Sequence, residues 1–208
     1  MNFLALAALP RVRETGSWHR CIDPAHITTA LSSAHTMARL ARFNPSYLLI
    51  PSAQFASLSF ADDPDVALRE IEAVFQSLAR GVPSRVSNPA SSSTFILKAQ
   101  VNLAEVFDLT DLTVVQARLG THAQELTGDW LGYDMRTHTT RVTGPNGVAP
   151  TQELGFELFR SGIEGFLSIS AKVPTNKTLT IFPKNLHLHA GSSVTITDSS
   201  GRVVHRLP

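Results

Sequence analysis

The sequence predicts an α+β domain, a mixed fold in which a β-core is flanked by helices. Helix-like and strand-like segments follow one another without the regular strand–helix–strand order of a doubly wound sheet. The chain has 208 residues, of which 43% are hydrophobic. This is enough to form one core of ordinary size. We therefore expect a single domain that spans residues 1–208.

The first elements are short. The apolar run at residues 1–10 predicts a first helix or strand, and the segment 24–41 predicts a helix that begins near Pro24. Apolar runs at 47–51 and 55–60 are typical of strands.

The best-marked helix is predicted from Pro64 to about Ala79. Asp63 is a suitable N-cap, Pro64 suits a first turn, and the charge of Asp65 suits the helix dipole. The apolar side of this helix is formed by Val66, Ala67, Ile71, Val74 and Phe75.

The second half of the chain predicts mainly strands, after a turn-rich segment at 87–93. The predicted elements are a strand at 94–110, a helix from Asp111 to Gln116, a helix at 151–161, a strand from Gly165, a strand at 179–183 and a β-hairpin at 192–207. The polar segment 128–150 contains several glycines and prolines, so we expect a mobile loop there.

Composition excludes several classes of protein. The formal net charge of +1 argues against a broad nucleic-acid-binding surface. A single cysteine, Cys21, excludes an internal disulfide framework and suits a reducing compartment. The apolar N-terminal run lacks the basic region of a signal peptide and is too short to span a bilayer. We expect a cytoplasmic protein that does not enter a membrane.

Short chemical motifs are nearly absent. His187 and His189 would share one strand face, but no third ligand of suitable spacing accompanies them, so we expect no metal. The sequence contains no glycine-rich phosphate loop, no G-x-S-x-G elbow and no H-E-x-x-H motif.

One carboxylate on the predicted helix stands out. Glu70 falls within the apolar side of that helix, where an unpaired charge is costly. Two interpretations follow. Either Glu70 pairs with a structural arginine, or it lines a functional site.

A set of segments spread along the chain bears on this choice. They are SWHRC, LARFNP, LSFADDPDVALREIE, FDLTDL, GDW, TQELGFELFRSGIEGFLSISAK and TLTIFPKNL. In this order and at these distances, the set resembles the RES domain family, from about Trp18 to Leu186. Members are toxins of bacterial toxin–antitoxin pairs, and their fold is similar to that of ADP-ribosyltransferase toxins. The resemblance therefore implies an ADP-ribosyltransferase-like β-core.

The resemblance also implies a site. The family's two arginines fall on Arg20 and Arg42, its helical acid on Glu70 and its serine on Ser170. Arginines suit the pyrophosphate of NAD, which they can grip bidentately, and a carboxylate suits the oxocarbenium-like ribose that forms as nicotinamide leaves. The implied catalytic residues are Arg42, Glu70 and Ser170.

The remaining NAD contacts depart in part from the family pattern. His19 beside Arg20, and Ser59 in SFAD, stand where the family commonly has tyrosines. Trp130 of GDW matches the family's tryptophan, although Leu131 follows it in place of a polar residue. We expect Arg20, His19, Ser59 and Trp130 to bind NAD, with His19 supplying part of the lost stacking surface.

The resemblance implies a toxin that degrades NAD, its substrate, by cutting the nicotinamide–ribose bond through hydrolysis or phosphorolysis. It also implies an antitoxin partner, commonly an Xre-like helix-turn-helix protein that blocks the pocket, while the toxin itself need not touch DNA. Two alternatives stay open. The chain is either an ADP-ribosyltransferase that modifies a specific protein, or a nucleotide-binding module without turnover.

Overall fold

The protein is built on a mixed β-sheet. The computed structural model describes residues 1–79, 94–121, 126–127, 147–188 and 191–208. Its strands are β1 (Arg11–Ile22), β2 (Leu58–Ala61), β3 (Phe95–Asp108), β4 (Gly165–Ile169), β5 (Lys177–Ile181), β6 (Ser193–Thr197) and β7 (Val203–Leu207). They follow the order β1-β2-β5-β4-β3-β6-β7. The pairing of β3 with β4 is parallel, and the other pairings are antiparallel.

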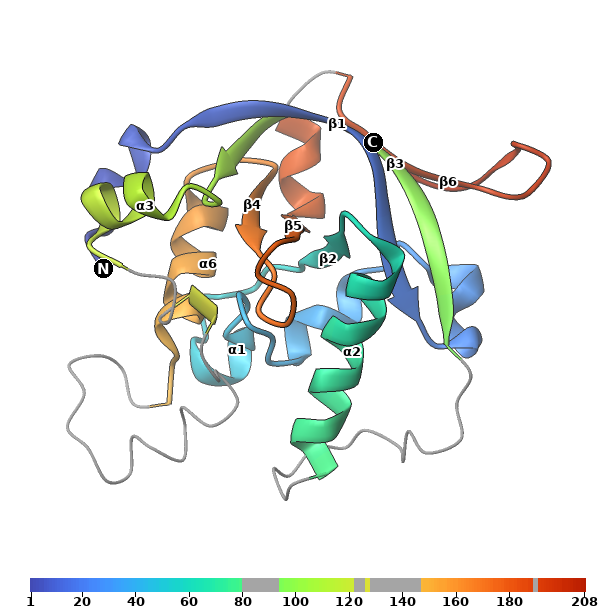
Figure 1. Ribbon diagram of the computed structural model, residues 1–208, viewed down its shortest axis with the longest axis horizontal. Coiled ribbons are helices and arrows are strands. Elements are labelled where there is room, and N and C mark those ends of the chain that lie inside the picture. The colour runs from blue at the N-terminus through green and yellow to red at the C-terminus, as the bar shows by residue number, and fades with distance from the viewer. Residues whose placement is uncertain (80–93, 122–125, 128–146, 189–190) are drawn as a thin grey trace.

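The sheet closes on itself. β1 pairs with β3 along its whole length and meets β2 at one residue pair, His19 with Ala61. The strands β1, β2, β5, β4 and β3 therefore form a ring, from which β6 and β7 extend. In Figure 1 the long strands β1 and β3 run side by side, with β2, β4 and β5 at the centre. β5 pairs with both β2 and β4, which brings the end of β4 close to the helix that follows β2.

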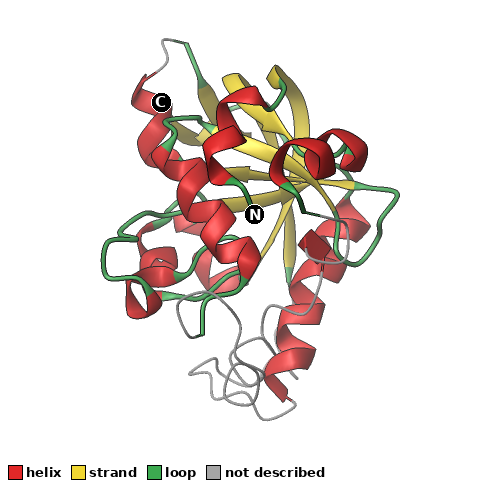
Figure 2. Ribbon diagram, turned by 90° about the vertical axis from the view of Figure 1, so that its left-hand side faces the viewer, coloured by secondary structure: helices red, strands yellow, loops and turns green. Residues whose placement is uncertain are grey.

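Helices surround these strands on more than one side (Figure 2). The α-helices are α1 (Ser46–Leu49), α2 (Pro64–Ala79), α3 (Leu112–Leu119) and α6 (Pro150–Arg160), and the 3-10 helices are η1 (Phe3–Ala8), η2 (Pro24–Thr29), η3 (Ala34–Ala38) and η5 (Pro183–Leu188). The mixed sheet with its helices confirms the predicted α+β class. No helix in the described part of the chain is both long and apolar enough to cross a membrane.

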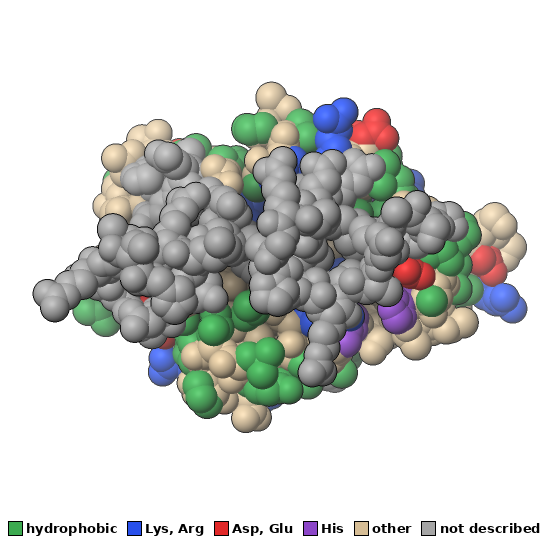
Figure 3. Space-filling view, turned by 90° about the horizontal axis from the view of Figure 1, so that it is seen from below, with side chains coloured by type: hydrophobic (Ala, Val, Ile, Leu, Met, Phe, Trp, Pro, Cys, Tyr) green, Lys and Arg blue, Asp and Glu red, His purple; other side chains and the backbone are tan. Residues whose placement is uncertain are grey.

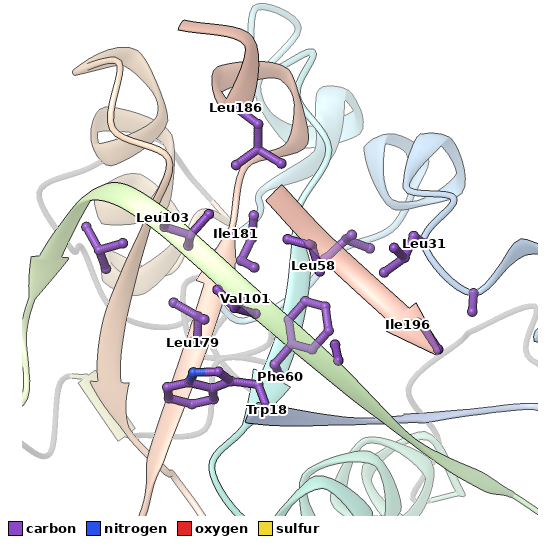
Figure 4. Close-up of a cluster of buried hydrophobic side chains, with 14 of the residues drawn as sticks. Trp18, Leu31, Leu58, Phe60, Val101, Leu103, Leu179, Ile181, Leu186 and Ile196 are labelled. Carbon is purple, nitrogen blue, oxygen red and sulfur yellow. The ribbon is translucent and has the colours of Figure 1, made fainter. Parts of the chain in front are cut away.

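Three clusters of buried side chains hold the fold together. The first draws residues from every strand of the ring and includes Trp18, Leu58, Phe60 and Leu179 (Figure 4). The second lies under α6 and is rich in phenylalanine. The third seats α2 on the sheet. Burial of this apolar surface supplies the main favourable term in folding.

The second cluster fixes a turn that belongs to the candidate site. Helix α6 approaches this turn so closely that a Cβ added to Gly155 would lie 1.9 Å from the main-chain oxygen of Phe43. The Phe43 ring meets Phe166 of β4 edge to face, at 4.8 Å between centroids. The residue before Phe43, Arg42, is thereby held next to β4.

Several predicted elements are confirmed. Helix α2 begins at Pro64, and Asp63 caps it by accepting hydrogen bonds from the Asp65 and Val66 main-chain nitrogens. Asp111 caps α3 in the same way. The predicted strand at 94–110, the helix at 151–161, the strands at Gly165 and 179–183, and the terminal hairpin correspond to β3, α6, β4, β5 and β6–β7.

The predicted helix over residues 24–41 is wrong. The segment instead forms η2 and η3, two short 3-10 helices. The Thr29 hydroxyl donates to the His26 main-chain oxygen, and the Thr36 hydroxyl donates to that of Ser33. Threonine and serine side chains compete in this way with the main-chain hydrogen bonds of a continuous helix.

The predicted strand at 47–51 is also wrong, because the chain forms α1 there. The Asn44 side-chain oxygen accepts a hydrogen bond from the Ser46 main-chain nitrogen, and the Ser46 hydroxyl accepts one from that of Leu48. These side-chain bonds favour a helical turn over an extended strand.

Two further predictions are the shared strand face of His187 and His189 and the loop at 128–150. His187 lies in η5 instead of a strand, and His189 lies outside the described residues. The predicted loop at 128–150 lies outside them up to residue 146, and α6 takes up its end.

Candidate functional site

Glu70 is held by main-chain and side-chain donors at the end of β4. Helix α2 turns Val66 and Ala67 toward Cys21 and Ala61 of the sheet, and Glu70 follows on the same half-buried side. Its Oε1 accepts a hydrogen bond of 2.5 Å from the Ser170 hydroxyl and one of 3.0 Å from the Ala171 main-chain nitrogen. Within the described residues, Oε2 has no such partner. The carboxylate is therefore fixed in direction through Oε1.

Ser170 acts through Glu70. It is buried, and its hydroxyl accepts hydrogen bonds from the main-chain nitrogens of Lys172 and Val173 while donating to Glu70. A hydroxyl has one donor and two acceptor positions. All three are occupied, so the geometry assigns Ser170 to positioning the carboxylate.

Arg42 lies beside this carboxylate. Its Nε and Nη2 donate to the Leu126 main-chain oxygen, and Nη1 and Nη2 reach the Ile169 main-chain oxygen at 3.5 and 3.4 Å. The guanidinium also lies over the Phe43 ring, 4.7 Å from its centroid. Burial lowers the pKa of Arg42 to about 10, and the Glu70 charge acts in the opposite direction. Arg42 therefore stays positively charged at neutral pH.

The ion pairs of the described residues do not include Glu70. They join Arg11 to Glu105, Arg160 to Glu157, and Arg202 to Asp198. Glu70 thus meets hydroxyl and amide donors in place of a direct arginine partner. This arrangement differs from the paired, structural glutamate that was one of the two interpretations of the sequence.

Arg20 is a second positively charged side chain. It follows His19, the residue at which β1 pairs with β2. Its Nη1 donates to the Ser59 main-chain oxygen at 3.1 Å, and its guanidinium lies 5.7 Å from the centroid of the Phe60 ring. Its Nε is buried and has no hydrogen-bond partner among the described residues. Burial lowers the pKa of Arg20 to about 10, with a smaller opposing effect of Cys21, so this side chain is also charged at neutral pH.

Two of the three other predicted NAD contacts, His19 and Ser59, belong to the strands that meet at this point. His19 pairs with Ala61 across β1 and β2, and its Nδ1 is buried without a hydrogen-bond partner among the described residues. Ser59 exposes its side chain, and strand alternation places it on the same face as Ala61. Trp130 lies outside the described residues.

The structure therefore brings Arg42, Glu70 and Ser170 together. Arg20, His19 and Ser59 belong to strands that meet, but alternation along β1 places the side chains of His19 and Arg20 on opposite faces of the sheet. Over the described part of the chain, no hydrogen bond or ion pair joins the two groups. Helix α2, which carries Glu70, packs on β1 and β2, which carry the second group. An apolar groove of about 520 Å³ lies elsewhere, between η2 and the β6–β7 hairpin, and none of these residues lines it.

Several hydrogen-bonding groups at the site could not be predicted from the sequence. The oxygens of Leu126, Ile169 and Ser59 and the nitrogen of Ala171 are main-chain atoms, which every residue type provides. No side-chain pattern marks them. Phe60, under Arg20, is different, because an aromatic residue next to a predicted strand end is visible in the sequence.

Replacing Arg42 with lysine is expected to lower the free energy of unfolding by about 2 kcal/mol or more. An ammonium group cannot reproduce the planar fork that serves two main-chain oxygens, and each buried acceptor left unsatisfied costs about 1–3 kcal/mol. Urea denaturation of Arg42→Lys measures the loss. Arg118→Lys, at an exposed position of α3, is the control. Equal stability of Arg42→Lys and the wild type would show that these bonds do not hold the turn.

Comparisons with known proteins show the fold. No family model matches the sequence, and a search of curated proteins finds no match. A structural match exists with a chain of the crystal structure described as the M. tuberculosis MbcT-MbcA toxin-antitoxin complex. The TM-score is 0.65 at 16% sequence identity, over 94% of this chain and 88% of that chain. The two chains share a fold over nearly their whole lengths.

Proposed function

We propose that this protein is an NAD-degrading toxin of a bacterial toxin–antitoxin pair. The observation that carries the proposal is the Glu70 carboxylate, held by Ser170 and Ala171 beside a charged Arg42, with one oxygen free of described partners. The resemblance to the RES domain family and the fold shared with a chain of a toxin–antitoxin complex support it. In this proposal the ring of strands is an ADP-ribosyltransferase-like core.

The proposed reaction breaks the bond between the ribose C1′ and the nicotinamide nitrogen. The bonding electron pair leaves with nicotinamide, which departs as a neutral molecule, and positive charge develops on the ribose. The Oε2 oxygen of Glu70 stabilises this charge and orients the oxygen of water or phosphate, which then bonds to C1′ and gives up a proton. A neutral leaving group needs no metal to stabilise it.

Arg20 is the proposed contact to the pyrophosphate. Its Nε is buried and without a described partner, and Nη2 lies on the same edge of the guanidinium, which is the edge that grips an oxyanion bidentately. Arg42 donates from all three of its nitrogens to main-chain oxygens. Its role as a second phosphate clamp stays a prediction, as do the NAD contacts of His19, Ser59 and Trp130.

The proposed partner is an antitoxin, an Xre-like helix-turn-helix protein that covers the site. Binding DNA would then belong to the partner. The proposed place of action is the cytoplasm, where NAD is abundant and a single cysteine stays reduced.

Expression of the chain in bacteria without its partner is expected to stop growth and to lower cellular NAD. Because each enzyme molecule cleaves NAD repeatedly, a small amount of enzyme is sufficient to deplete the NAD of a cell. Growth curves and NAD measurements on cells with confirmed soluble expression test this. Normal growth with unchanged NAD would favour the binding module, and modification of one lysate protein by purified enzyme with labelled NAD would favour an ADP-ribosyltransferase.

A further inference from the structure

The turn between β4 and β5, residues 170–176, carries both groups that hold Glu70. Figure 1 shows this β4–β5 turn, in orange, beside α2. The Ser170 main-chain nitrogen donates to the Asn176 main-chain oxygen at 2.8 Å, which closes the turn. Regular pairing between β4 and β5 ends where the turn begins. The position of its donors relative to Glu70 therefore depends on how the turn itself is held.

A second carboxylate, that of Asp62, binds the other end of this turn. Asp62 lies between the end of β2 and the start of α2. Its Oδ1 accepts a hydrogen bond of 3.2 Å from the Asn176 side-chain nitrogen, and its Oδ2 accepts one of 2.9 Å from the Lys177 main-chain nitrogen. The Asp62 main-chain nitrogen also donates to the Lys177 main-chain oxygen. The segment that begins α2 is thus joined to the residues that end the turn.

The β4–β5 turn is held at two separate points. Among the described residues, its hydrogen bonds to α2 and to the residue before the helix cap belong to Glu70 and Asp62. Glu70 lies about 10 Å further along the chain direction of the helix. Val173 packs in the apolar cluster under α2, but apolar contact is not directional. Asn176 connects the two points, because its side chain binds Asp62 while its main-chain oxygen binds Ser170.

Asp62 does not belong to an ion pair among the described residues. On the face that Figure 3 shows, by contrast, several acidic side chains lie next to Lys, Arg or His side chains. Both donors to the Asp62 carboxylate are neutral N–H groups, and both come from the end of the β4–β5 turn and the start of β5. The contacts of Asp62 therefore fix the position of the turn and do not balance a cation.

From these observations we infer that Asp62 and Asn176 are positioning residues for the proposed reaction. They hold the β4–β5 turn so that its donors aim the Glu70 carboxylate at the ribose. A charged group stabilises a transition state only from the correct place, and a misplacement of about 1 Å can cost a hundredfold in rate. Neither residue needs to touch NAD for this. The role rests on the proposed function, because the group they position is the proposed catalytic carboxylate.

The test measures nicotinamide release by the purified full-length chain. Asp62→Ala and Asn176→Asp are each expected to lower kcat about tenfold and to change KM for NAD less than about twofold, because the carboxylate moves while the substrate contacts stay. Asn176→Asp sets two carboxylates against each other. Adding Asp62→Asn is expected to restore kcat, since the new amide can donate to the new carboxylate and its oxygen can accept from Lys177.

Asp198→Ala is the matched control. The Asp198 carboxylate likewise binds main-chain nitrogens of its own hairpin, those of Ser200 and Arg202, between β6 and β7. The same change there is expected to leave kcat unaltered. Should Asp62→Ala fold poorly, Asn176→Asp and its pairing with Asp62→Asn carry the test.

Two further readouts separate positioning from a general loss of structure. In the Glu70→Gln background, Asp62→Ala is expected to lower kcat less than about twofold, because the charge that it positions is gone. The Ala171 amide, which donates to Glu70, is expected to exchange its hydrogen about tenfold faster in Asp62→Ala, and at the wild-type rate when Asp62→Asn and Asn176→Asp are combined. This exchange is measured without substrate.

Unchanged kcat in both Asp62→Ala and Asn176→Asp would overturn the positioning role. So would an equal loss with and without Glu70→Gln, or a combined variant that stays as slow as Asn176→Asp alone. Lack of nicotinamide release by the wild type would refute the proposed function, and exchange at Ala171 would then decide whether Asp62 and Asn176 hold the carboxylate. Wild-type release with unaltered kcat and exchange in Asp62→Ala would refute only the positioning role.

Discussion

Glu70→Gln is expected to lower NAD turnover by about two orders of magnitude or more, the scale of losing one strong electrostatic contributor. Glutamine keeps the shape and the side-chain oxygen that accepts from Ser170 and Ala171, so the local hydrogen bonds can persist. Only the negative charge disappears. The proposed transition state carries positive charge on the ribose, and the negative charge of Glu70 is what stabilises it.

Stability separates this role from a structural one. Breaking a buried ion pair costs about 3–5 kcal/mol, but Glu70 has no such pair among the described residues. Weaker, neutral hydrogen bonds should cost about 1 kcal/mol. The melting temperature of Glu70→Gln should therefore stay near that of the wild type.

Nicotinamide release and melting temperature are measured together for Glu70→Gln and for Glu157→Gln. Glu157 is a matched control because it is also a helical glutamate, but its partner is Arg160 in a surface ion pair, which contributes little to stability. We expect full activity from the control. Retained turnover in a strongly destabilised Glu70→Gln would mean that Glu70 serves the fold and not the chemistry.

Arg20→Lys is expected to weaken NAD binding by about ten- to a hundredfold, because hydrogen bonds to a charged group are worth about 1.5–3 kcal/mol. The ammonium group keeps the charge but loses the edge formed by Nε and Nη2. Binding is measured by calorimetry on the Glu70→Gln background, in which NAD survives the titration.

The control for this experiment is Arg206→Lys, at an exposed position of β7. The fold should tolerate Arg20→Lys well, since the guanidinium makes a single described hydrogen bond, to the Ser59 main-chain oxygen. Wild-type affinity of the Arg20→Lys variant would remove this residue from the proposed pyrophosphate contact.

Local patterns predicted α2 and the inward side of Glu70, because the cap at Asp63 and the spacing of apolar residues act within one helix. The same kind of pattern gave wrong predictions between Pro24 and Pro51, where a long helix and a strand were expected. There the conformation depends on bonds such as those of Asn44 and Ser46, in which side chains bind nearby main-chain atoms. Such bonds compete with regular structure in ways that apolar spacing does not show.

The candidate site was predictable only as a set of residue types. The resemblance placed Glu70 and Ser170 in one site, but the hydrogen bond between them depends on the pairing of β5 with both β2 and β4. It also could not show that Arg42 donates to the main-chain oxygens of Leu126 and Ile169, which leaves Arg20 with the freer guanidinium edge. Main-chain acceptors take their positions from tertiary structure alone.

The contact between Glu70 and Ser170 also has a consequence during protein synthesis. A growing chain that has been translated through Glu70 already contains Arg20 and Arg42, yet neither of the two residues that hold the carboxylate. Ser170 and Ala171 are added a hundred positions later. The candidate site is therefore complete only after translation has passed Ala171, so an unfinished chain that already carries both arginines cannot yet hold Glu70 in place.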